Sequence, residues 1–229
     1  MSRAPKVAVL LAGCGHLDGA EVREAVLALL ALDQHGAEVQ CLAVDGPQHH
    51  VVDHLTGQVA PGETRNILTE AARIARGKVK ALAGASADDY DALVMPGGYG
   101  VAKQHCGFAF QGPEASVHPH VEAFVKGFFA AGKPVAAICI APALVALILA
   151  KEGEHPALTI GNDPGCAAAL QKLGARHQDR PSAREVVVDE TLKLVTTPAY
   201  MFDDARLSDV QVGIDRAVTE VLKRVSVAV

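Results

Sequence analysis

Residues 136–143 read Ala136-Ala137-Ile138-Cys139-Ile140-Ala141-Pro142-Ala143, and in them an apolar run typical of a buried strand is followed directly by an apolar helical run. Cys139 stands at the corner between the two. At such a corner the sulfur lies at the carboxyl end of a sheet and at the positive end of a helix dipole, which lowers the pKa of a thiol. Because the thiolate is the nucleophile, Cys139 is the first candidate catalytic residue; the alternative is a buried structural cysteine.

The same change from strand to helix recurs along the whole chain. Strands are predicted at 6–12, 38–44, 92–95, 134–138, 158–160, 185–189 and 194–197, and helices at 21–35, 65–76, 117–131, 142–150, 165–173 and 205–225. The nearly continuous apolar run from Val7 to Leu11 is typical of a parallel strand buried on both faces. This alternation predicts one α/β domain over residues 1–229, a flavodoxin-like doubly wound parallel sheet with helices on both faces. A turn at 189–192 predicts a small antiparallel appendage.

Composition narrows the class of partner. The net charge is −5, Trp is absent, and no block of basic residues appears. These features argue against a nucleic-acid or membrane partner. The apolar run from Val7 to Ala12 is too short to span a membrane, and no processing site follows it.

The cysteines bear on the cellular compartment. The five of them stand at positions 14, 41, 106, 139 and 166, without a C-x-x-C spacing. An odd number of scattered cysteines without an export signal predicts free thiols in a reducing compartment, for which we expect the cytoplasm.

Four predicted strands are followed by segments whose residues could take part in binding or catalysis. In doubly wound folds, ligands bind at these carboxyl ends of the strands. The segments are 13–16, 96–100, 139–140 and 197–199, and we expect them to converge on one pocket. In the second segment, the backbone N–H groups of Gly97 and Gly98 predict an oxyanion hole, together with that of Ile140. Cys14 and His16 in the first segment, Thr197 in the last, and His105 nearby are further pocket candidates.

Two acidic residues open the first predicted helix. Glu21 alone is explained by compensation of the helix dipole in the first turn. Glu24 lies one turn further in and borders the apolar face of the helix, where desolvation raises the pKa of a carboxyl and equips it to hold a proton for a neighbouring thiol or substrate. We therefore favour Glu24 as the acid–base partner of Cys139 and keep Glu21 as the alternative.

Other kinds of site find little support. The phosphate-binding spacings G-x-G-x-x-G and G-x-x-x-x-G-K-[ST] and the serine elbow G-x-S-x-G are absent. The histidine clusters at 49–54 and 118–120 lack a carboxylate or cysteine at ligand spacing, so we interpret them as solvated surface. No cofactor and no metal are predicted.

Six segments together resemble a known family. They are Leu11-Ala12-Gly13-Cys14-Gly15, Asp18-Gly19-Ala20-Glu21, Glu63-Thr64-Arg65-Asn66-Ile67-Leu68, Pro96-Gly97-Gly98-Tyr99-Gly100-Val101-Ala102-Lys103, Cys139-Ile140-Ala141-Pro142 and Thr196-Thr197-Pro198-Ala199-Tyr200-Met201. Their order and spread over nearly the whole chain resemble the ElbB-type proteins, named for enhancing lycopene biosynthesis, in the PfpI-type superfamily with a glutamine-amidotransferase-like fold.

The resemblance implies roles for several residues. The family's cysteine elbow falls on Cys139, its thiol-bonded acidic residue on Glu24 with Glu21 as fallback, and its diglycine on Gly97 and Gly98. An arginine near the pocket in some relatives falls on Arg65, and Lys103 ends the diglycine segment. The resemblance also implies a homodimer and a cofactor-independent glyoxalase activity that turns glyoxal into glycolate.

One departure from the superfamily pattern limits the chemistry. Protease-like and some glyoxalase-like relatives carry a histidine directly after the cysteine, and Ile140 stands there instead. Peptide hydrolysis is therefore disfavoured. Glutamine hydrolysis is disfavoured as well, because true glutamine amidotransferases need a distant His-x-Glu pair that the late region 197–200 does not supply.

The favoured prediction is a glyoxalase III-like lyase that acts on a small aldehyde through a Cys139 hemithioacetal, and that also reverses early glycation adducts. The alternatives are a non-enzymatic thiol sensor or partner-binding protein and, more weakly, an amidotransferase-like subunit in isoprenoid metabolism.

Overall fold

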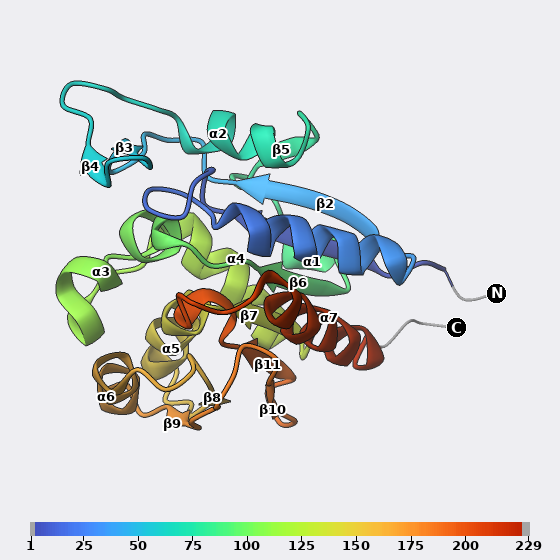
Figure 1. The fold of residues 1–229 in the computed structure, drawn as a ribbon. Coiled ribbons are helices and arrows are strands. Elements are labelled where there is room, and N and C mark those ends of the chain that lie inside the picture. The colour runs from blue at the N-terminus through green and yellow to red at the C-terminus, as the bar shows by residue number, and fades with distance from the viewer. Residues whose placement is uncertain (1–2, 226–229) are drawn as a thin grey trace.

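The computed structural model describes residues 3–225, whose centre is a seven-stranded sheet (Figure 1). Along the sheet the strands follow the order β10 (Val187–Asp189), β11 (Leu194–Thr197), β7 (Val135–Ile138), β6 (Ala92–Met95), β1 (Lys6–Leu11), β2 (Glu38–Ala43) and β5 (Val79–Ala81). Only β10 runs antiparallel to its neighbour, and every other adjacent pair is parallel. The predicted fold class and its antiparallel appendage are confirmed.

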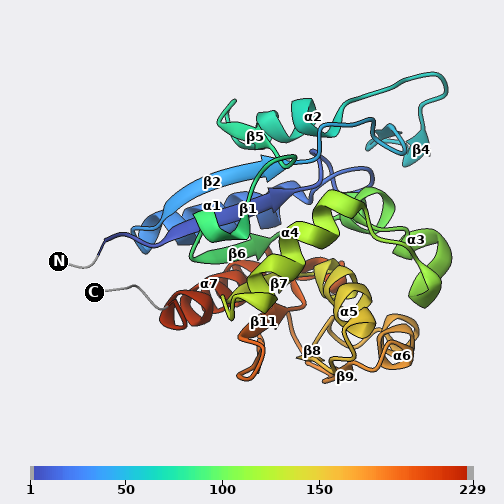
Figure 2. The same cartoon turned by 180° about the vertical axis from the view of Figure 1, so that it is seen from behind.

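Helices cover both faces of this sheet, as Figures 1 and 2 show from opposite sides. On one face α1 (Val22–Gln34) packs beside α7 (Leu207–Lys223), and on the other lie α4 (Pro119–Ala130) and α5 (Ala141–Lys151). The shorter helices are α2 (Ile67–Ile74), α3 (Phe108–Gln111) and α6 (Pro164–Lys172). Because both faces are covered, β1 is buried from Val7 to Leu11, as its continuous apolar sequence predicts.

Some elements differ from the sequence prediction. The strand expected at 158–160 is limited to β8 (Ala157–Leu158), which pairs with β9 (Arg176–His177) outside the main sheet. The short hairpin of β3 (Val52–Asp53) and β4 (Gln58–Val59), the edge strand β5 and the short helix α3 were not predicted. Runs of two to four residues are too short to establish a period of two or of 3.6, so periodicity cannot reveal them.

The sheet order positions the site. Strands β11, β7, β6 and β1 are consecutive neighbours in the sheet and are mutually parallel. Their carboxyl ends therefore lie side by side at one edge, and the loops that follow them meet there.

Candidate active site

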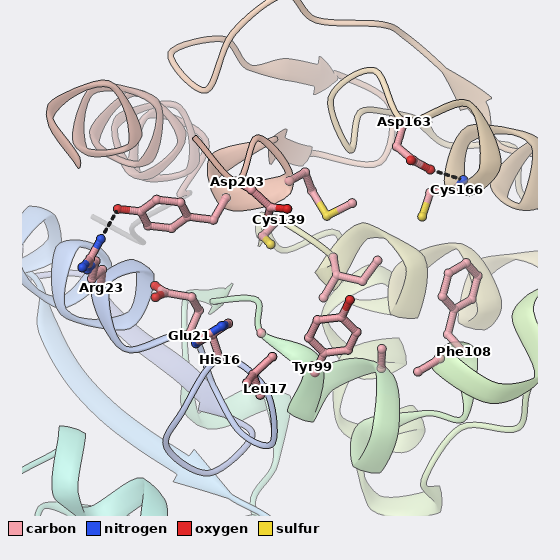
Figure 3. Close-up of a pocket in the computed structure, with 16 residues that line it drawn as sticks. His16, Leu17, Glu21, Arg23, Tyr99, Phe108, Cys139, Asp163, Cys166 and Asp203 are labelled. Carbon is pink, nitrogen blue, oxygen red and sulfur yellow. Dashed lines mark hydrogen bonds between the residues drawn. The ribbon is translucent and has the colours of Figure 1, made fainter. Parts of the chain in front are cut away.

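A cavity of about 920 Å³ opens at this edge of the sheet. Its walls come from three of the four predicted segments, 13–16, 96–100 and 139–140, and from the starts of α1, α3 and α6 and the turn after β11 (Figure 3). The predicted convergence of the strand ends on one pocket is confirmed for these three segments, whereas residues 197–199 lie outside the cavity wall. Of the candidates named from the sequence, those that line the cavity are His16, Glu21, Gly98, Cys139 and Ile140.

Cys139 forms a strained corner between β7 and α5. Its φ of 61° lies in the left-handed region, which non-glycine residues seldom adopt and which costs on the order of 1–3 kcal/mol. The Cys139 N–H donates to the Thr197 carbonyl at 2.9 Å, which ties the corner to the end of β11. The side chain reaches the cavity although the residue is only 6% exposed. The backbone N–H groups of Gly98 and Ile140 donate to its sulfur.

Glu24 lies directly behind the thiol and is completely buried. Its Oε2 accepts the Gly97 N–H at 2.9 Å, and its Oε1 accepts the Tyr200 N–H at 3.1 Å. The carboxyl is also hydrogen-bonded to Cys139. Burial, and next the nearby charge of Glu21, raise the pKa of Glu24 to about 8, so the carboxyl holds its proton at neutral pH.

Glu21 has a different place. It is the N-cap residue of α1, and its Oε2 accepts the Glu24 N–H at 2.6 Å. Burial raises its pKa, although less strongly than for Glu24. Glu21 therefore fixes the start of the helix and forms part of the cavity wall, while Glu24 contacts the thiol.

The expectation of a lowered thiol pKa is wrong. Burial raises the pKa of Cys139 well above its ordinary value, and the adjacent Glu24 raises it further. The N–H groups of Gly98 and Ile140 act in the opposite direction but do not offset these effects. Desolvation outweighs the helix dipole here. The first proton lost by the Cys139–Glu24 pair therefore leaves one negative charge that the two groups share, since a second charge would be strongly repelled.

The diglycine is required by close packing. A Cβ atom on Gly97 would lie 2.5 Å from the Cβ of Cys139 and 2.8 Å from Oε2 of Glu24. Gly98 has a φ of +96°, and a Cβ there would lie 2.4 Å from backbone atoms of the loop before α1. The lack of side chains lets this loop touch both the nucleophile and its acidic partner, and it directs the Gly98 N–H at the sulfur.

Several predicted residues lie elsewhere. Arg65 contacts Glu63 and Glu70 at 3.6 Å each, and Cys14 lies near the same charged group on the α2 side. The Lys103 ammonium donates to the Leu17 carbonyl at 2.9 Å, so it supports the loop that carries His16. Thr197 is buried and its hydroxyl donates to the Glu185 carbonyl.

His105 does not reach the cavity either. It is 1% exposed, and burial lowers its pKa to about 3, which makes it a neutral core residue.

Sequence reasoning missed several residues of the cavity wall. They are Leu17, Arg23, Tyr99, Ala102, Phe108, Ala109, Asp163, Cys166, Tyr200, Met201 and Asp203. Arg23 donates to the Tyr200 hydroxyl at 3.2 Å and lies over its ring. Asp163 caps α6 by accepting the Cys166 N–H at 2.6 Å. Tyr99 lies inside the strand-end segment 96–100 and Tyr200 directly follows the segment 197–199, so both could have been named from the sequence, but nothing in the sequence brings α6 to the same cavity.

Metal and membrane features are not found in residues 3–225. No three His, Cys, Asp or Glu side chains of this part of the chain gather in a way that would hold a metal ion. Within the same residues, no helix has both the length and the apolar character needed to cross a membrane.

Comparison with known proteins identifies the family. A family model described as the DJ-1/PfpI family matches residues 6–205. The chain belongs to the DJ-1/PfpI family. The chain is also 44% identical to the human glutamine amidotransferase-like class 1 domain-containing protein 3, mitochondrial, over 96% of this chain and 83% of that protein. A rat ES1 protein homolog, mitochondrial, is 40% identical over 95% of this chain and 83% of its own length.

Solved structures agree with this assignment to the DJ-1/PfpI family. An isoprenoid biosynthesis protein with an amidotransferase-like domain from Ehrlichia chaffeensis is 38% identical, with a TM-score of 0.89, and the match covers 97% of this chain and 100% of that one. Glyoxalase III from Candida albicans has a TM-score of 0.63 at 16% identity, covering 97% of this chain and 98% of that one, and shows the shared fold.

The comparison contradicts the predicted cytoplasmic location. The human, rat and zebrafish relatives are all named as mitochondrial proteins. The prediction rested on free cysteines, and free cysteines fit any reducing compartment, so they could not distinguish the cytoplasm from the interior of an organelle.

Proposed function

We propose that this protein is a cofactor-independent thiol enzyme that converts 2-oxoaldehydes to 2-hydroxy acids, with glyoxal to glycolate as the simplest case. The observation that carries the proposal is the buried Glu24 carboxyl, which is hydrogen-bonded to Cys139 at the wall of an open cavity. Such a pair supplies a nucleophile and a proton carrier at one point, which aldehyde isomerisation needs.

The reaction begins with addition of the sulfur to the aldehyde carbon. The reacting form is the pair that has lost one proton, with the charge on the Cys139 sulfur and the remaining proton on Glu24. As the sulfur forms a bond to this carbon, Glu24 gives its proton to the aldehyde oxygen, so a hemithioacetal results and Glu24 is left as a carboxylate. The Gly98 and Ile140 N–H groups already point at the sulfur, so they lie beside the carbon where the oxyanion forms. The high pKa of the free pair does not block this step, because one proton leaves the pair with the pKa of about 8 given for Glu24.

The next steps move protons and exchange oxidation levels within the substrate. The Glu24 carboxylate takes the proton from the former aldehyde carbon and returns it to the neighbouring carbon, while the hydroxyl proton of the first carbon passes to the oxygen of the second. The first carbon is thereby oxidised to a thioester and the second is reduced to an alcohol. Water then hydrolyses the thioester to the 2-hydroxy acid and restores the thiol. One molecule of water is consumed, and no external electron donor or acceptor is needed.

Ile140 in place of a histidine is consistent with this chemistry. Aldehyde isomerisation expels no amine, so it does not need the acid that peptide or glutamine hydrolysis requires. Reversal of early glycation adducts would use the same thiol addition and stays within the proposal. We also keep within it the finer likeness to ElbB-type proteins, supported by the six sequence segments, and an assembly as a homodimer.

The thiol-sensor alternative would use the same Cys139 thiolate, so the raised pKa of this thiol does not separate it from the enzyme. The proton carrier Glu24 favours the enzyme, because formation of a sulfenic acid needs no proton transfer between carbon atoms. The amidotransferase-like alternative is supported by the names of the human and Ehrlichia chaffeensis relatives and by no residue of the site.

One experiment separates the three functions. The purified protein and Cys139→Ser are incubated with glyoxal, with glutamine and with hydrogen peroxide, and glycolate, ammonia and consumed peroxide are measured. We expect many equivalents of glycolate from the wild type and none from the variant. Release of ammonia alone, or stoichiometric peroxide consumption without glycolate, would refute the proposal.

A further inference from the structure

The size of the cavity exceeds what glyoxal needs. Glyoxal, with two carbons and two oxygens, takes up about the space of four water molecules, on the order of 120 Å³. The cavity in front of Cys139 measures about 920 Å³, a volume in the range of sites that hold ligands of drug size. A small dialdehyde would leave most of this space filled with water.

The wall on one side of Cys139 is aromatic and apolar. Figure 3 shows Tyr99 and Phe108 on the same side of the cavity, away from Glu21 and Arg23. Tyr99 is 52% exposed although its backbone is fixed, because its N–H donates to the His16 carbonyl at 2.7 Å. The Lys103 ammonium lies 5.2 Å from the centre of the ring. An aromatic side chain held in place with much of its surface open suits the binding of a flat apolar group.

The charged side chains of the cavity wall restrict the charge of the substrate's substituent. Three carboxyl groups line the cavity, those of Glu21, Asp163 and Asp203. The charged partner on the same wall is the Arg23 guanidinium, which already donates to the Tyr200 hydroxyl. His16 also lines the cavity, and Lys103 lies behind Tyr99 with its ammonium committed to the Leu17 carbonyl. The excess of carboxylates opposes a negatively charged substituent.

From these features we infer that the substrates are 2-oxoaldehydes with a bulky, flat, apolar substituent that is neutral or cationic. The inference rests on the proposed function and names its substrate class. The aldehyde end reaches Cys139, and the substituent lies against Tyr99 and Phe108, where glyoxal has no group to place.

The test is a series of substrates assayed with the same protein. We compare kcat/KM for glyoxal, methylglyoxal, phenylglyoxal, 4-carbamoylphenylglyoxal and 4-carboxyphenylglyoxal, measuring the 2-hydroxy acid formed. We expect phenylglyoxal to exceed methylglyoxal at least tenfold, and the neutral carbamoyl compound to exceed its carboxylate isostere at least tenfold.

Substitutions in the cavity wall test whether its side chains cause these substrate preferences. Tyr99→Ala should reduce the ratio of phenylglyoxal to methylglyoxal several-fold. Phe110→Ala is the matched control, since Phe110 is also 52% exposed but does not line the cavity, and it should keep the ratio. Asp203→Asn should narrow the gap between the carbamoyl and carboxylate compounds.

The substrate series distinguishes failure of the inferred substrate preference from failure of the proposed function. Turnover of glyoxal and methylglyoxal at rates equal to or above that of phenylglyoxal would overturn the inference and leave the proposed function intact. Equal turnover of the carbamoyl and carboxylate compounds would overturn its charge criterion. An absence of product from every compound would overturn the proposed function, and the inference with it.

Discussion

Replacing Glu24 with glutamine tests whether this buried carboxyl holds a proton, because only the wild type should lose stability through this group as the pH rises. In the folded protein the pKa of Glu24 is raised from 4.5 to about 8. Below pH 4.5 the carboxyl is protonated in both the folded and the unfolded chain, so its contribution to stability is fully present. As the pH rises toward 8, the unfolded chain releases the proton while the folded chain keeps it. Glu24 therefore costs stability at about 1.4 kcal/mol per pH unit, roughly 5 kcal/mol over this window.

The glutamine variant lacks this titration but has a defect of its own. Both oxygens of Glu24 accept backbone N–H groups, from Gly97 and from Tyr200. A glutamine has only one oxygen, so its amide NH₂ must face one of these two donors. Leaving one buried N–H without an acceptor costs about 1–3 kcal/mol. At pH 5 the variant should therefore be the less stable protein.

The two stability curves should cross. The wild type loses about 1.4 kcal/mol per pH unit above 4.5, so it reaches the deficit of the variant between roughly pH 5 and pH 7. Above the crossing Glu24→Gln should be the more stable protein. Urea unfolding at pH 5, 6, 7, 8 and 9, with the midpoint and slope fitted at each pH, measures this directly.

Glu21→Gln is the matched control, one helical turn earlier. It loses part of an N-cap, at a cost of about 0.5–2 kcal/mol, and leaves the Glu24 carboxyl in place. Its curve should keep a downward slope, but the slope should end at a lower pH than in the wild type, because the charge of Glu21 helps to raise the pKa of Glu24. A constant offset between Glu24→Gln and the wild type from pH 5 to pH 9 would refute the reasoning, because it would mean that Glu24 does not hold a proton. In the glycolate assay, the loss of proton transfer should lower turnover by about a hundredfold or more.

Three further predictions concern the surroundings of the thiol. Gly97→Ala should lower turnover at least tenfold, because its Cβ would push Cys139 from Glu24, whereas Gly46→Ala, whose Cβ meets only Val44 at 3.6 Å, should stay near wild type; equal activities would contradict the close-packing argument. Alkylation of Cys139 by iodoacetamide, measured by peptide mass spectrometry, should be slower at pH 7 than that of free cysteine, because burial raises the pKa of this thiol; labelling at pH 7 as fast as that of free cysteine would show that the thiol pKa is not raised. Sedimentation velocity should give the mass of a dimer, and Val26→Asp should shift it toward the monomer if the exposed apolar side chains of Val22, Val26 and Leu30 on α1 form the contact; a monomeric wild type would contradict the prediction.

The main elements of the site could be predicted because they follow strand ends. Cys139 and the diglycine come directly after apolar runs, and neighbouring parallel strands bring such points together whatever the details of packing. The choice of Glu24 over Glu21 also follows from the helical period, since a residue one turn inside an amphipathic helix faces the core. The structure places Glu24 fully inside and Glu21 at the N-cap.

The rule that residues directly after the strands line the pocket gave a wrong prediction for Cys14. Cys14 follows β1 as Cys139 follows β7, and Gly13 and Gly15 on either side of it have positive φ values. Its thiol lies near the charges of Glu70 and Arg73, although His16, two residues later, lines the cavity. A sequence shows that glycines permit a turn at this point, but not in which direction it goes. The prediction of a lowered pKa for the Cys139 thiol was wrong for a related reason. The helix dipole can be recognised in a sequence, whereas desolvation depends on what covers the sulfur, and here Glu24 and the diglycine loop do so.

The contact between Glu24 and Tyr200 could not be predicted from the sequence around either residue. Ala199, which precedes Tyr200, has a φ of 44° although it is not glycine, and it is fully buried. This conformation brings the Tyr200 N–H to Oε1 of Glu24, a residue 176 positions earlier in the chain. Cys139 is strained in the same way on the other side of the carboxyl. Strain of this kind, on the order of 1–3 kcal/mol at each residue, persists only where the surrounding structure holds it in place. Both strained residues present groups to one buried carboxyl, so the packing of β7, β11 and α1 maintains the geometry that joins the thiol to its proton carrier.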